Sequence, residues 1–446
     1  MHYGLDFGTS NSSISINTPQ GVKVLAIDDL ALDPQILRSV LYFKKDDGRF
    51  MGEKAIRQMI ADNEMRLPPK IIKEFTGDIV DIFLPSPGDS GGVDIWKTDV
   101  VAEYDINKPG QFLQALKTSL REGFFGKANV LGQTYSLEEL IGFILRFMKM
   151  QADGLNDRSV DEVVLGRPVH YRDSQTDDLQ IEKRMSEAAR LAGFSKVSFL
   201  AEPIAATLSF FQKHSQDSTI LLFDFGGGTL DFCLMQKIGK GKKILATDGL
   251  SIGGDLFNEE IMEQKIAKHF GTEIVWGQKG LPMPIYIKER LRKWYELQVL
   301  NTPDFHSFMN ELKRENRNRA VVEKLETLIN YDLSFSSFSA IEKAKIELSE
   351  KGETSIVFNQ KNIFLQEKIT RLEFERMIKP YLKQIEKTID TVLRKGKTEK
   401  DQLDFVICTG GSSLIPAVKQ MLVDKFGSPK ILFHDIFTGV AAGLAL

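Results

Sequence analysis

The feature of this sequence that most restricts its fold is a short pattern that occurs twice. Residues 3–11 and residues 220–232 each read as an apolar strand ending in an aspartate, a glycine turn with a hydroxyl residue, and a returning strand. The two aspartates, Asp6 and Asp224, are separated by nearly half of the 446 residues. We therefore expect two related lobes, with lobe I over residues 1–214 and lobe II over residues 215–446.

Strand and helix patterns alternate between the two hairpins. Residues 163–165 and 197–200 predict short buried strands, and residues 177–192 predict a helix that Gly193 ends. Strands that alternate with helices indicate an α/β fold with a largely parallel sheet and helices on its faces.

Each lobe is expected to carry an insertion. Clusters of proline and glycine in residues 79–132 predict an irregular segment, which we place within a lobe I insertion over about 43–135. A mostly helical insertion is predicted in lobe II, over about 255–369. Directly after it, Thr370 and Glu373 have the spacing of a helix capping box, and Pro380 is expected to kink the helix that follows.

Composition excludes several classes of protein. The 58 basic and 61 acidic residues give a net charge of -3, which argues against a nucleic-acid binder with a strongly basic surface. No apolar stretch is long enough to span a membrane, and the N-terminus has no signal-peptide pattern. Cys233 and Cys408 lie in apolar runs and are predicted to be buried free thiols, which suits a reducing, cytoplasmic location.

The glycine turns of the two hairpins are candidate phosphate-binding loops. Glycine lets backbone N–H groups approach a phosphate without a Cβ clash, and neighbouring hydroxyls add donors. Either turn alone could be an ordinary glycine turn with a capping aspartate, but the matched pair indicates a nucleotide. The candidate binding residues are Gly8, Thr9, Ser10, Asn11, Gly226, Gly227, Gly228 and Thr229.

The aspartates at the mouths of these loops indicate a metal ion. A carboxylate beside a triphosphate would repel it unless a cation lay between them, and hydrated Mg²⁺ is the ordinary bridge. We expect Asp6, Asp224 and Asp231 to hold Mg²⁺ through water molecules.

Taken in order, the motifs resemble those of the heat-shock protein 70 (DnaK) family of the actin-like ATPase superfamily. Besides the two hairpins, residues 201–206 resemble its Glu-Pro-Thr-Ala-Ala motif, and residues 253–257 its Gly-Gly-Glu-Asp-Phe motif. Residues 342–349 are similar to its adenine-facing helix, and residues 409–416 to its adenosine motif. The resemblance implies an actin-like (ribonuclease-H-like), two-lobed ATPase fold with duplicated mixed sheets, which binds ATP or ADP with Mg²⁺ and hydrolyses ATP.

The resemblance also implies roles for single residues. Lys73, with Lys70 as the alternative, would offset charge on the γ-phosphate, and Glu202 would position water or act on the metal. Thr229 and Asp231 would complete the catalytic set; which carboxylate receives the proton stays open. Glu342 and Lys345 would reach the ribose and Ser349 the base. Gly254, Gly410, Gly411, Ser412 and Asp435 would shape the rest of the nucleoside pocket.

Two departures from the family pattern change what is expected. The sequence stops where the peptide-binding domain of the family would follow, as in its short YegD-like members, so we expect no client-peptide pocket of that kind. Ile346 stands where the family has an arginine stacked on adenine, which predicts a purely apolar contact with the base.

The leading functional hypothesis is therefore a chaperone-like ATPase whose lobes close on ATP. A protein client, a co-chaperone or an exchange factor would sense that closure. Neither nucleic acid nor a membrane is an expected partner. Two alternatives stay open: a small-molecule kinase, for which no second substrate pocket is identified, and an actin-like assembly or regulatory ATPase.

Overall fold

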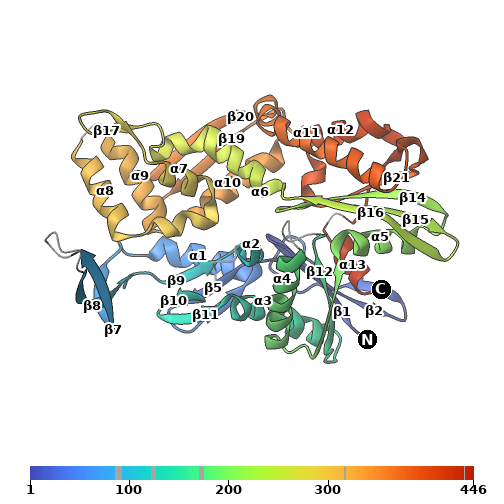
Figure 1. Cartoon of the computed structure of the whole chain (residues 1–446), viewed down its shortest axis with the longest axis horizontal. Coiled ribbons are helices and arrows are strands. Elements are labelled where there is room, and N and C mark those ends of the chain that lie inside the picture. The colour runs from blue at the N-terminus through green and yellow to red at the C-terminus, as the bar shows by residue number, and fades with distance from the viewer. Residues whose placement is uncertain (86–92, 122–126, 170–174, 316–317, 436) are drawn as a thin grey trace.

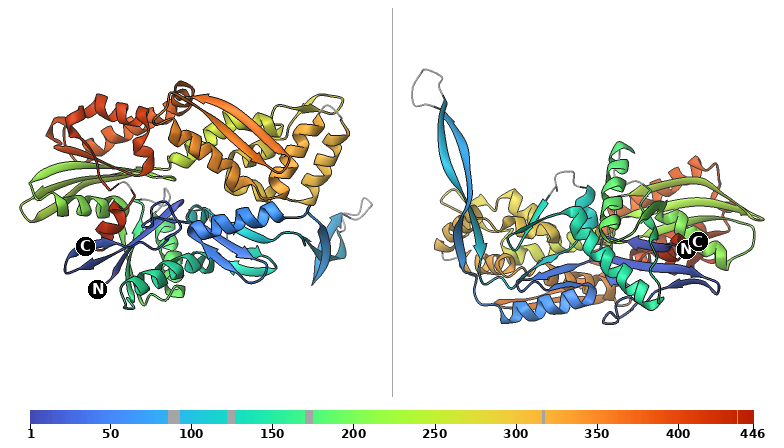
Figure 2. Two further views of the ribbon diagram at one scale, coloured as in Figure 1. Left: turned by 180° about the vertical axis from the view of Figure 1, so that it is seen from behind. Right: turned by 90° about the horizontal axis from the view of Figure 1, so that it is seen from below.

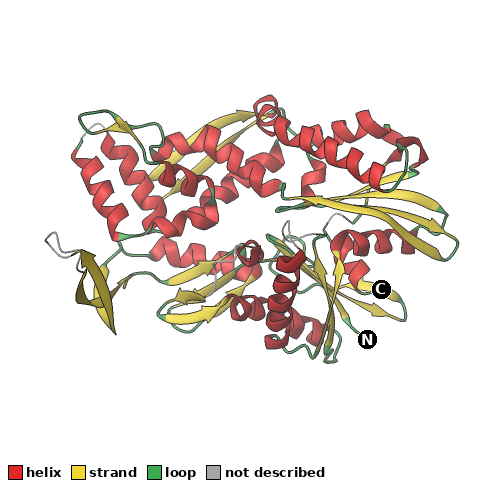
Figure 3. Cartoon of the chain, viewed as in Figure 1, coloured by secondary structure: helices red, strands yellow, loops and turns green. Residues whose placement is uncertain are grey.

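The computed structural model describes residues 1–85, 93–121, 127–169, 175–315, 318–435 and 437–446. Two halves lie one above the other in Figure 1, the lower one coloured blue to green and the upper one yellow-green to red. Both halves combine strands and helices (Figure 3), and the two chain ends lie close together in the lower half. None of the helices in these ranges has the length and apolar character needed to cross a membrane.

The lobe I sheet is built around the first hairpin. Its strand order is β13–β12–β1–β2–β3, and β4 pairs with β2 beside this order. The strands are β1 (Tyr3–Phe7), β2 (Asn11–Thr18), β3 (Gly21–Val24), β4 (Leu37–Arg38), β12 (Glu162–Arg167) and β13 (Lys196–Ala201). β1 is antiparallel to β2 and parallel to β12. The strands predicted at residues 163–165 and 197–200 are confirmed as parts of β12 and β13.

The lobe II sheet repeats this arrangement around the second hairpin. Its order is β16–β15–β14–β21–β22. The strands are β14 (Ser218–Phe225), β15 (Leu230–Ile238), β16 (Gly241–Leu250), β21 (Phe405–Thr409) and β22 (Ile431–Phe433). In both sheets an antiparallel three-stranded meander is extended by two parallel strands. The duplication of the hairpins is thus a duplication of topology, and the expected largely parallel sheet is wrong for the meander half of each lobe.

Helices cover both faces of the lobe I sheet. Val163 and Leu165 of β12 belong to a core with α3 (Leu137–Leu155) and α4 (Gln175–Leu191), whereas Val164 packs on the opposite side, against α5 (Glu202–Lys213) and α13 (Gly439–Leu444). The helix predicted at residues 177–192 is confirmed as α4. The predicted lobe boundary at residue 214 falls between α5 and β14.

The last helix returns to the first lobe. The Ser15 hydroxyl of β2 donates a hydrogen bond to the Ala441 carbonyl of α13 at 2.5 Å. A Cβ on Gly443 would lie 1.7 Å from the Ala205 carbonyl oxygen, so only glycine allows α13 to pack this closely on α5. The C-terminal helix α13 therefore packs on β1 and β2 of lobe I and shares a core with buried residues of the lobe II strands β14, β15 and β21.

The insertion in lobe I contains a small sheet and a long hairpin. The small sheet consists of β5 (Leu41–Lys44), β6 (Arg49–Met51) and β9 (Gly110–Leu113), next to α1 (Gly52–Met65). β7 (Ile71–Pro85) and β8 (Val93–Asp105) pair with each other and project from the body (Figure 2). After them come α2 (Leu116–Arg121), β10 (Lys127–Val130) and β11 (Gln133–Ser136). The prediction that residues 79–132 are irregular is wrong for residues 79–85 and 93–105, which pair with each other in β7 and β8, whereas residues 86–92 and 122–126 lie outside the described residues.

The insertion in lobe II is mostly helical, as its sequence predicts. It contains α6 (Gly254–Ile261), α7 (Ile285–Arg292), α8 (Pro303–Arg314), α9 (Arg319–Asn330) and α10 (Ser334–Glu347), with a short hairpin of β17 (Val275–Trp276) and β18 (Leu281–Pro282). A second hairpin, β19 (Glu353–Gln360) and β20 (Ile363–Thr370), leads into α11 (Arg371–Lys395), and α12 (Pro416–Phe426) follows β21.

Two predictions about lobe II are confirmed by local geometry. The Thr370 hydroxyl accepts a hydrogen bond from the Glu373 N–H while the Glu373 carboxylate accepts one from the Thr370 N–H, which is the predicted capping box of α11. Pro380 lies inside this helix, and the kink expected there stays a prediction. Cys233 and Cys408 are both free and buried.

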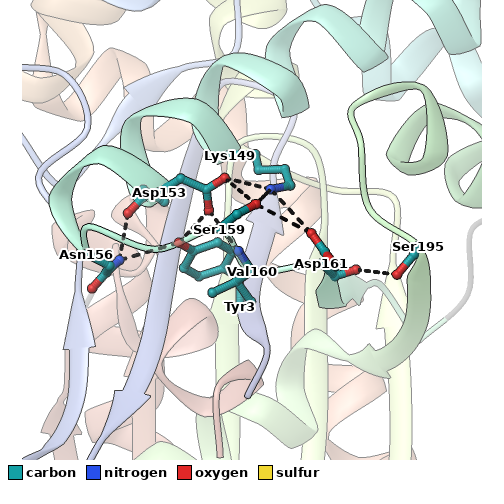
Figure 4. Close-up of polar contacts among 9 residues, drawn as sticks. Tyr3, Lys149, Asp153, Asn156, Ser159, Val160, Asp161 and Ser195 are labelled. Carbon is teal, nitrogen blue, oxygen red and sulfur yellow. Dashed lines mark hydrogen bonds and ion pairs between the residues drawn. The ribbon is translucent and has the colours of Figure 1, made fainter.

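A polar cluster ties the end of α3 to the sheet of lobe I (Figure 4). The buried Tyr3 hydroxyl of β1 donates to Asp153 Oδ1 at 2.9 Å, and the Val160 N–H donates to the same carboxylate at 3.1 Å. Lys149 Nζ donates to Asp153 Oδ2 at 2.6 Å. Burial, followed by the bond to Asp153, raises the pKa of Tyr3 well above its usual range, so the ring stays a neutral donor. The cluster lies away from the cleft and stabilises lobe I.

Candidate functional site

The two glycine turns have the same local structure. The Gly8 N–H donates to the Asn11 carbonyl at 3.0 Å, and the Gly226 N–H donates to the Thr229 carbonyl at 3.0 Å. Each turn is therefore closed by the same bond, from the N–H of its first glycine to the carbonyl three residues later. Glycine is needed in the first turn, because a Cβ on Gly8 would lie 2.2 Å from the Asn11 carbonyl oxygen.

The two turns face each other across the lobes. A Cβ on Gly227 would lie 3.1 Å from the Ser10 hydroxyl oxygen, and a Cβ on Gly228 would lie 3.1 Å from the Thr9 hydroxyl oxygen. Residues far apart in the chain thus meet at one crevice, as the paired motifs predict. The Thr9 and Ser10 hydroxyls of lobe I thus lie against the glycine turn of lobe II, and hydroxyls and glycine-turn N–H groups are the kinds of donor that bind a polyphosphate.

Acidic side chains gather behind the two turns. Asp224 and Asp231 lie opposite each other in the β14–β15 ladder. Asp6, in the equivalent position of β1, lies near Glu202: a Cβ on Gly166 would be 3.1 Å from Glu202 Cγ and 3.6 Å from Asp6 Oδ1. Gly166 therefore lets the two acidic residues approach the end of β12.

Few donors satisfy this cluster of carboxylates. The Thr409 hydroxyl donates to Asp224 Oδ1 at 2.8 Å, and the Val169 N–H donates to Asp231 Oδ1 at 3.1 Å. Burial and the charge of Glu202 raise the pKa of Asp6 from 3.8 to about 8. Burial also raises the pKa of Asp224 to about 7, against the hydrogen bond from Thr409. Among the described residues, positive charge is too scarce to offset the burial of Asp6 and Asp224.

That shortage fits a divalent cation. Neighbouring buried carboxylates repel one another when both are ionised, which costs free energy. A cation that binds oxygen ligands neutralises this charge and stabilises the ionised form. Asp6, Asp224 and Asp231, with Glu202 beside them, offer only oxygen donors, which is the ligand type that Mg²⁺ prefers. In the described part of the chain no three ligating side chains are grouped so that they could hold one ion directly, so these carboxylates fit Mg²⁺ only as an ion held through water molecules, which is what the sequence predicts.

A lysine that sequence reasoning missed lies in this cluster. Lys117 Nζ of α2 lies 2.7 Å from Glu202 Oε1, and both side chains are buried. Its charge lowers the pKa values of Asp6 and Asp224, against the larger effect of their burial. In the sequence, Lys117 is one of many lysines in an amphipathic segment, so nothing marks it.

The position of the Lys73 side chain, which was predicted to be catalytic, cannot be compared directly with that of Lys117. Lys73 belongs to β7 and lies opposite Glu103 in β8, within the projecting hairpin. Its side chain lies outside the described residues. The role assigned to Lys73 thus stays a prediction.

The predicted nucleoside residues of lobe II lie together beside the second turn. The Ser412 hydroxyl donates to the Gly226 carbonyl at 2.9 Å, and Lys345 Nζ donates to the Gly254 carbonyl at 2.9 Å. A Cβ on Gly254 would meet Ser412 Oγ at 2.6 Å and Lys345 Nζ at 3.0 Å. Glycine at this position lets α6, α10 and the 3₁₀ turn Gly411–Leu414 converge.

Gly410 has a backbone that requires glycine. Its φ is 75°, and a Cβ would lie 2.2 Å from the Phe225 carbonyl oxygen. Gly411 follows, with the Phe437 ring 3.2 Å from the position of its Cβ. This tight turn brings the residues after β21 against the second phosphate loop.

Two predicted residues lie toward the edges of this region. Ser349 follows the end of α10 and donates its N–H to the Ile346 carbonyl at 2.9 Å. Asp435 lies ahead of α13 and pairs with Lys213 of α5 at 2.5 Å. Its predicted contribution to the nucleoside pocket has no described contact to support it.

A pocket between the lobes adjoins the first turn. Its lining includes Thr9, Ser10, Arg38, Asp255, Asn258 and Glu342. Two buried amide oxygens of this lining, Gln114 Oε1 and Asn258 Oδ1, have no hydrogen-bond partner among the described residues. Buried polar atoms are normally paired, so these two indicate room for a polar ligand or water.

Arg38 and Asp255 in this lining were not predicted from the sequence. Burial raises the pKa of Asp255 to about 6, while a bond with the Ser10 hydroxyl works in the opposite direction. Arg38 bonds to Glu342 of lobe II at 3.2 Å. Arg38 lies in no motif, and Asp255 lies within the motif at residues 253–257 without a role of its own having been predicted; each lines this pocket only because the lobes meet.

Comparison with known proteins agrees with this geometry. A family model described as Hsp70 protein matches residues 111–278 and 336–445, more than half of the chain. The chain is 24% identical over 434 residues to the chaperone protein DnaK of Thermus thermophilus, covering 95% of this chain and 56% of that protein. It is 25% identical over 427 residues to the DnaK chaperone of Guillardia theta, covering 94% and 55%. For the DnaK chaperone of Deinococcus proteolyticus, the identity is 25% over 436 residues, covering 95% and 55%.

The chain spans about half the length of these relatives, and the matched segments include the second phosphate hairpin, Glu202 and the residues of the nucleoside side. The duplicated mixed sheets and the crevice between the paired glycine turns agree with the actin-like ATPase fold of that family. On these grounds the chain is a member of the Hsp70 family.

Proposed function

We propose that this chain binds ATP with Mg²⁺ in the crevice between its lobes and hydrolyses it, as a chaperone-like ATPase. The observation that carries the proposal is the meeting of the two glycine turns, with Ser10 next to Gly227 and Thr9 next to Gly228. Donors from both lobes would contact the same phosphates. Binding would therefore favour the closed arrangement of the lobes.

The acidic cluster supplies the reason for magnesium. When bound, the ion would neutralise charge on the phosphates and on the carboxylates. Asp6, Asp224 and Asp231 would hold it through water. The raised pKa values of Asp6 and Asp224 without a cation support this assignment, because binding of the ion would favour the ionised state of both carboxyls.

We propose Lys117 as the cation at the reacting phosphate, in place of Lys73, which the family resemblance implied for this role. Its ammonium lies 2.7 Å from Glu202 Oε1, and it acts electrostatically on Asp6 and Asp224. There it would offset negative charge that develops on the γ-phosphate. Glu202 would hold the attacking water by a hydrogen bond and accept its proton directly on a carboxylate oxygen.

The adenosine would lie against α10 and the Gly410 turn. Lys345 and Ser412 hold this face of the pocket in place through hydrogen bonds to the Gly254 and Gly226 carbonyls. Ile346 is 61% exposed on the next position of α10, which suits an apolar contact with the base. Closure of the lobes around the nucleotide would be the signal that a protein partner reads.

Phosphate release from ATP tests the lysine assignment. Lys117→Ala is expected to lower the rate of hydrolysis about 100- to 1,000-fold, because it removes one preorganised charge at the transition state. Lys73→Ala is expected to stay within about twofold of the unmodified protein, since we place the cation at Lys117. Lys196→Ala, which breaks the exposed ion pair with Glu162, is a matched control.

Calorimetric titration with Mg-ATP separates lost catalysis from lost folding. Lys117→Ala is expected to bind Mg-ATP while hydrolysing it slowly. The assignment would be contradicted if Lys117→Ala hydrolysed ATP at the rate of the unmodified protein. It would also be contradicted if Lys73→Ala, and not Lys117→Ala, lost hydrolysis by about 100- to 1,000-fold. No binding of Mg-ATP by the unmodified protein would contradict the proposed function itself.

A further inference from the structure

Arg38 is held against the first phosphate loop by hydrogen bonds and strand pairing. It ends β4 and lies opposite Asn11 in the β2–β4 pairing. Its Nη1 donates to Asn11 Oδ1 at 3.2 Å, and the N–H of the next residue, Ser39, donates to the Ser10 carbonyl at 3.0 Å. Backbone and side-chain bonds thus join this short strand to the loop, so Arg38 and the loop move together.

The same guanidinium reaches the other lobe. Arg38 Nη2 donates to Glu342 Oε2 of α10 at 3.2 Å, between residues 304 positions apart in the chain. Both side chains are about one-third exposed or less, at 27% and 32%, and both line the pocket beside Thr9 and Ser10. An arginine that donates from two nitrogens in fixed directions orients its partner more strictly than a single ammonium would.

Glu342 is left with one carboxylate oxygen for another partner. Arg38 engages Oε2, and no described residue donates a hydrogen bond to Oε1. Burial would raise the pKa of the Glu342 carboxyl, yet the charges of Arg38 and Lys345 bring it below its ordinary value. An ionised carboxylate with a free oxygen, at the wall of a polar pocket, is an acceptor for hydroxyl groups.

We propose that Arg38 is a positioning residue for ribose recognition, which holds the Glu342 carboxylate where it accepts the ribose hydroxyls. This inference rests on the proposed nucleotide function. Because Arg38 is attached to the lobe I loop and Glu342 to lobe II, the acceptor is oriented only when the lobes are closed. Recognition of the sugar then depends on closure, in addition to recognition of the phosphates.

Comparison of ATP with 2′-deoxyATP tests this role directly. The two ligands differ by one hydroxyl, so a change in their affinity ratio reports the sugar contact and is insensitive to a general loss of stability. A hydroxyl bonded to a charged acceptor is worth about tenfold or more in affinity, which is the preference for ATP expected of the unmodified protein.

Calorimetry would measure both dissociation constants for the unmodified protein and for two variants at this position. Arg38→Gln is expected to reduce the preference for ATP to about twofold, mainly through weaker binding of ATP. Arg38→Lys, which keeps the charge and loses the two-pronged geometry, is expected to give an intermediate ratio. Arg319→Gln breaks a surface ion pair with Glu323 and serves as the control that leaves the ratio unchanged.

Each outcome decides the proposal. If Arg38→Gln weakens ATP and 2′-deoxyATP equally, Arg38 contacts a phosphate or only holds the lobes, and the inference is overturned. An unchanged ratio in Arg38→Gln overturns it as well. Should Arg38→Gln not fold, a ratio in Arg38→Lys equal to that of the unmodified protein has the same consequence. Unmodified protein that binds both ligands equally refutes the ribose role alone, whereas unmodified protein that binds neither refutes the proposed function too.

Discussion

Replacing Asp6 by asparagine should separate the stability of the fold from its function. Asparagine has nearly the shape of a protonated aspartic acid but does not titrate. Burial and the charge of Glu202 raise the pKa of Asp6 from 3.8 to about 8. The folded protein without metal therefore holds a proton on Asp6 over a pH range in which the unfolded chain has released it.

The sign of the effect follows from proton linkage. Between about pH 4 and pH 8 the folded state binds more protons at Asp6 than the unfolded state does, so stability falls as pH rises. Each pKa unit corresponds to about 1.4 kcal/mol, and the window that opens by pH 7 is about three units. Because the pKa of Asp224 is raised by the same surroundings, we do not assign the whole loss of stability to Asp6, and we expect Asp6 to account for about 2 to 4 kcal/mol of it.

Asp6→Asn should therefore be more stable than the unmodified protein at pH 7 to 8, by about 2 to 4 kcal/mol, and about equal to it near pH 4. Thermal unfolding of the metal-free proteins at several pH values measures the difference. Asp401→Asn, at an exposed position, is the control and should show no such trend. Added Mg-ATP should stabilise the unmodified protein at pH 8 and have little effect on Asp6→Asn, since the variant lacks a metal-holding carboxylate.

The reasoning would be refuted if the stabilities of Asp6→Asn and of the unmodified protein changed with pH in the same way across this range. That result would mean that Asp6 is solvated or already neutralised by a neighbouring group. The crowding of carboxylates would then no longer support a magnesium site.

Two further predictions concern the fold. Gly410→Ala should destabilise the protein by more than about 2 kcal/mol and weaken ATP binding, because φ is 75° and the new Cβ would meet the Phe225 carbonyl oxygen at 2.2 Å; unfolding by urea with a parallel ATP titration checks both effects. Tyr3→Phe should lower the free energy of unfolding by about 1 to 2 kcal/mol and leave ATP hydrolysis unchanged, because it removes a buried bond to Asp153 outside the cleft. A change in hydrolysis without a change in stability would contradict the second of these.

Local patterns in the sequence were sufficient for several elements. The capping box at Thr370, the hairpins at Asp6 and Asp224, and the strands and helix between them depend on residues a few positions apart. Backbone sterics and short-range hydrogen bonds determine such features before the chain is compact. The pairing of the two hairpins also followed from sequence, because a duplicated motif predicts a duplicated fold.

The prediction that failed over the longest segment was that of irregular structure where β7 and β8 pair with each other. Clusters of proline and glycine around residues 85–92 suggested irregular structure over a much wider range. In the structure, β7 and β8 flank that cluster as a two-stranded ladder. Propensity near a turn says little about how far its flanking strands extend, because the partner strand decides that.

Residue order alone establishes that two glycine turns, each preceded by an aspartate, belong to two related lobes, because each motif is a self-contained piece of chain. It does not reveal the groups that complete the crevice. Lys117 meets Glu202 across 85 positions, and Arg38 meets Glu342 across 304. A lysine or an arginine is commonly an exposed, solvated side chain, and only the docking of lobes and insertions turns these two into buried or bridging charges. The energy of such a charge depends on the neighbours that folding places around it, which no local pattern contains.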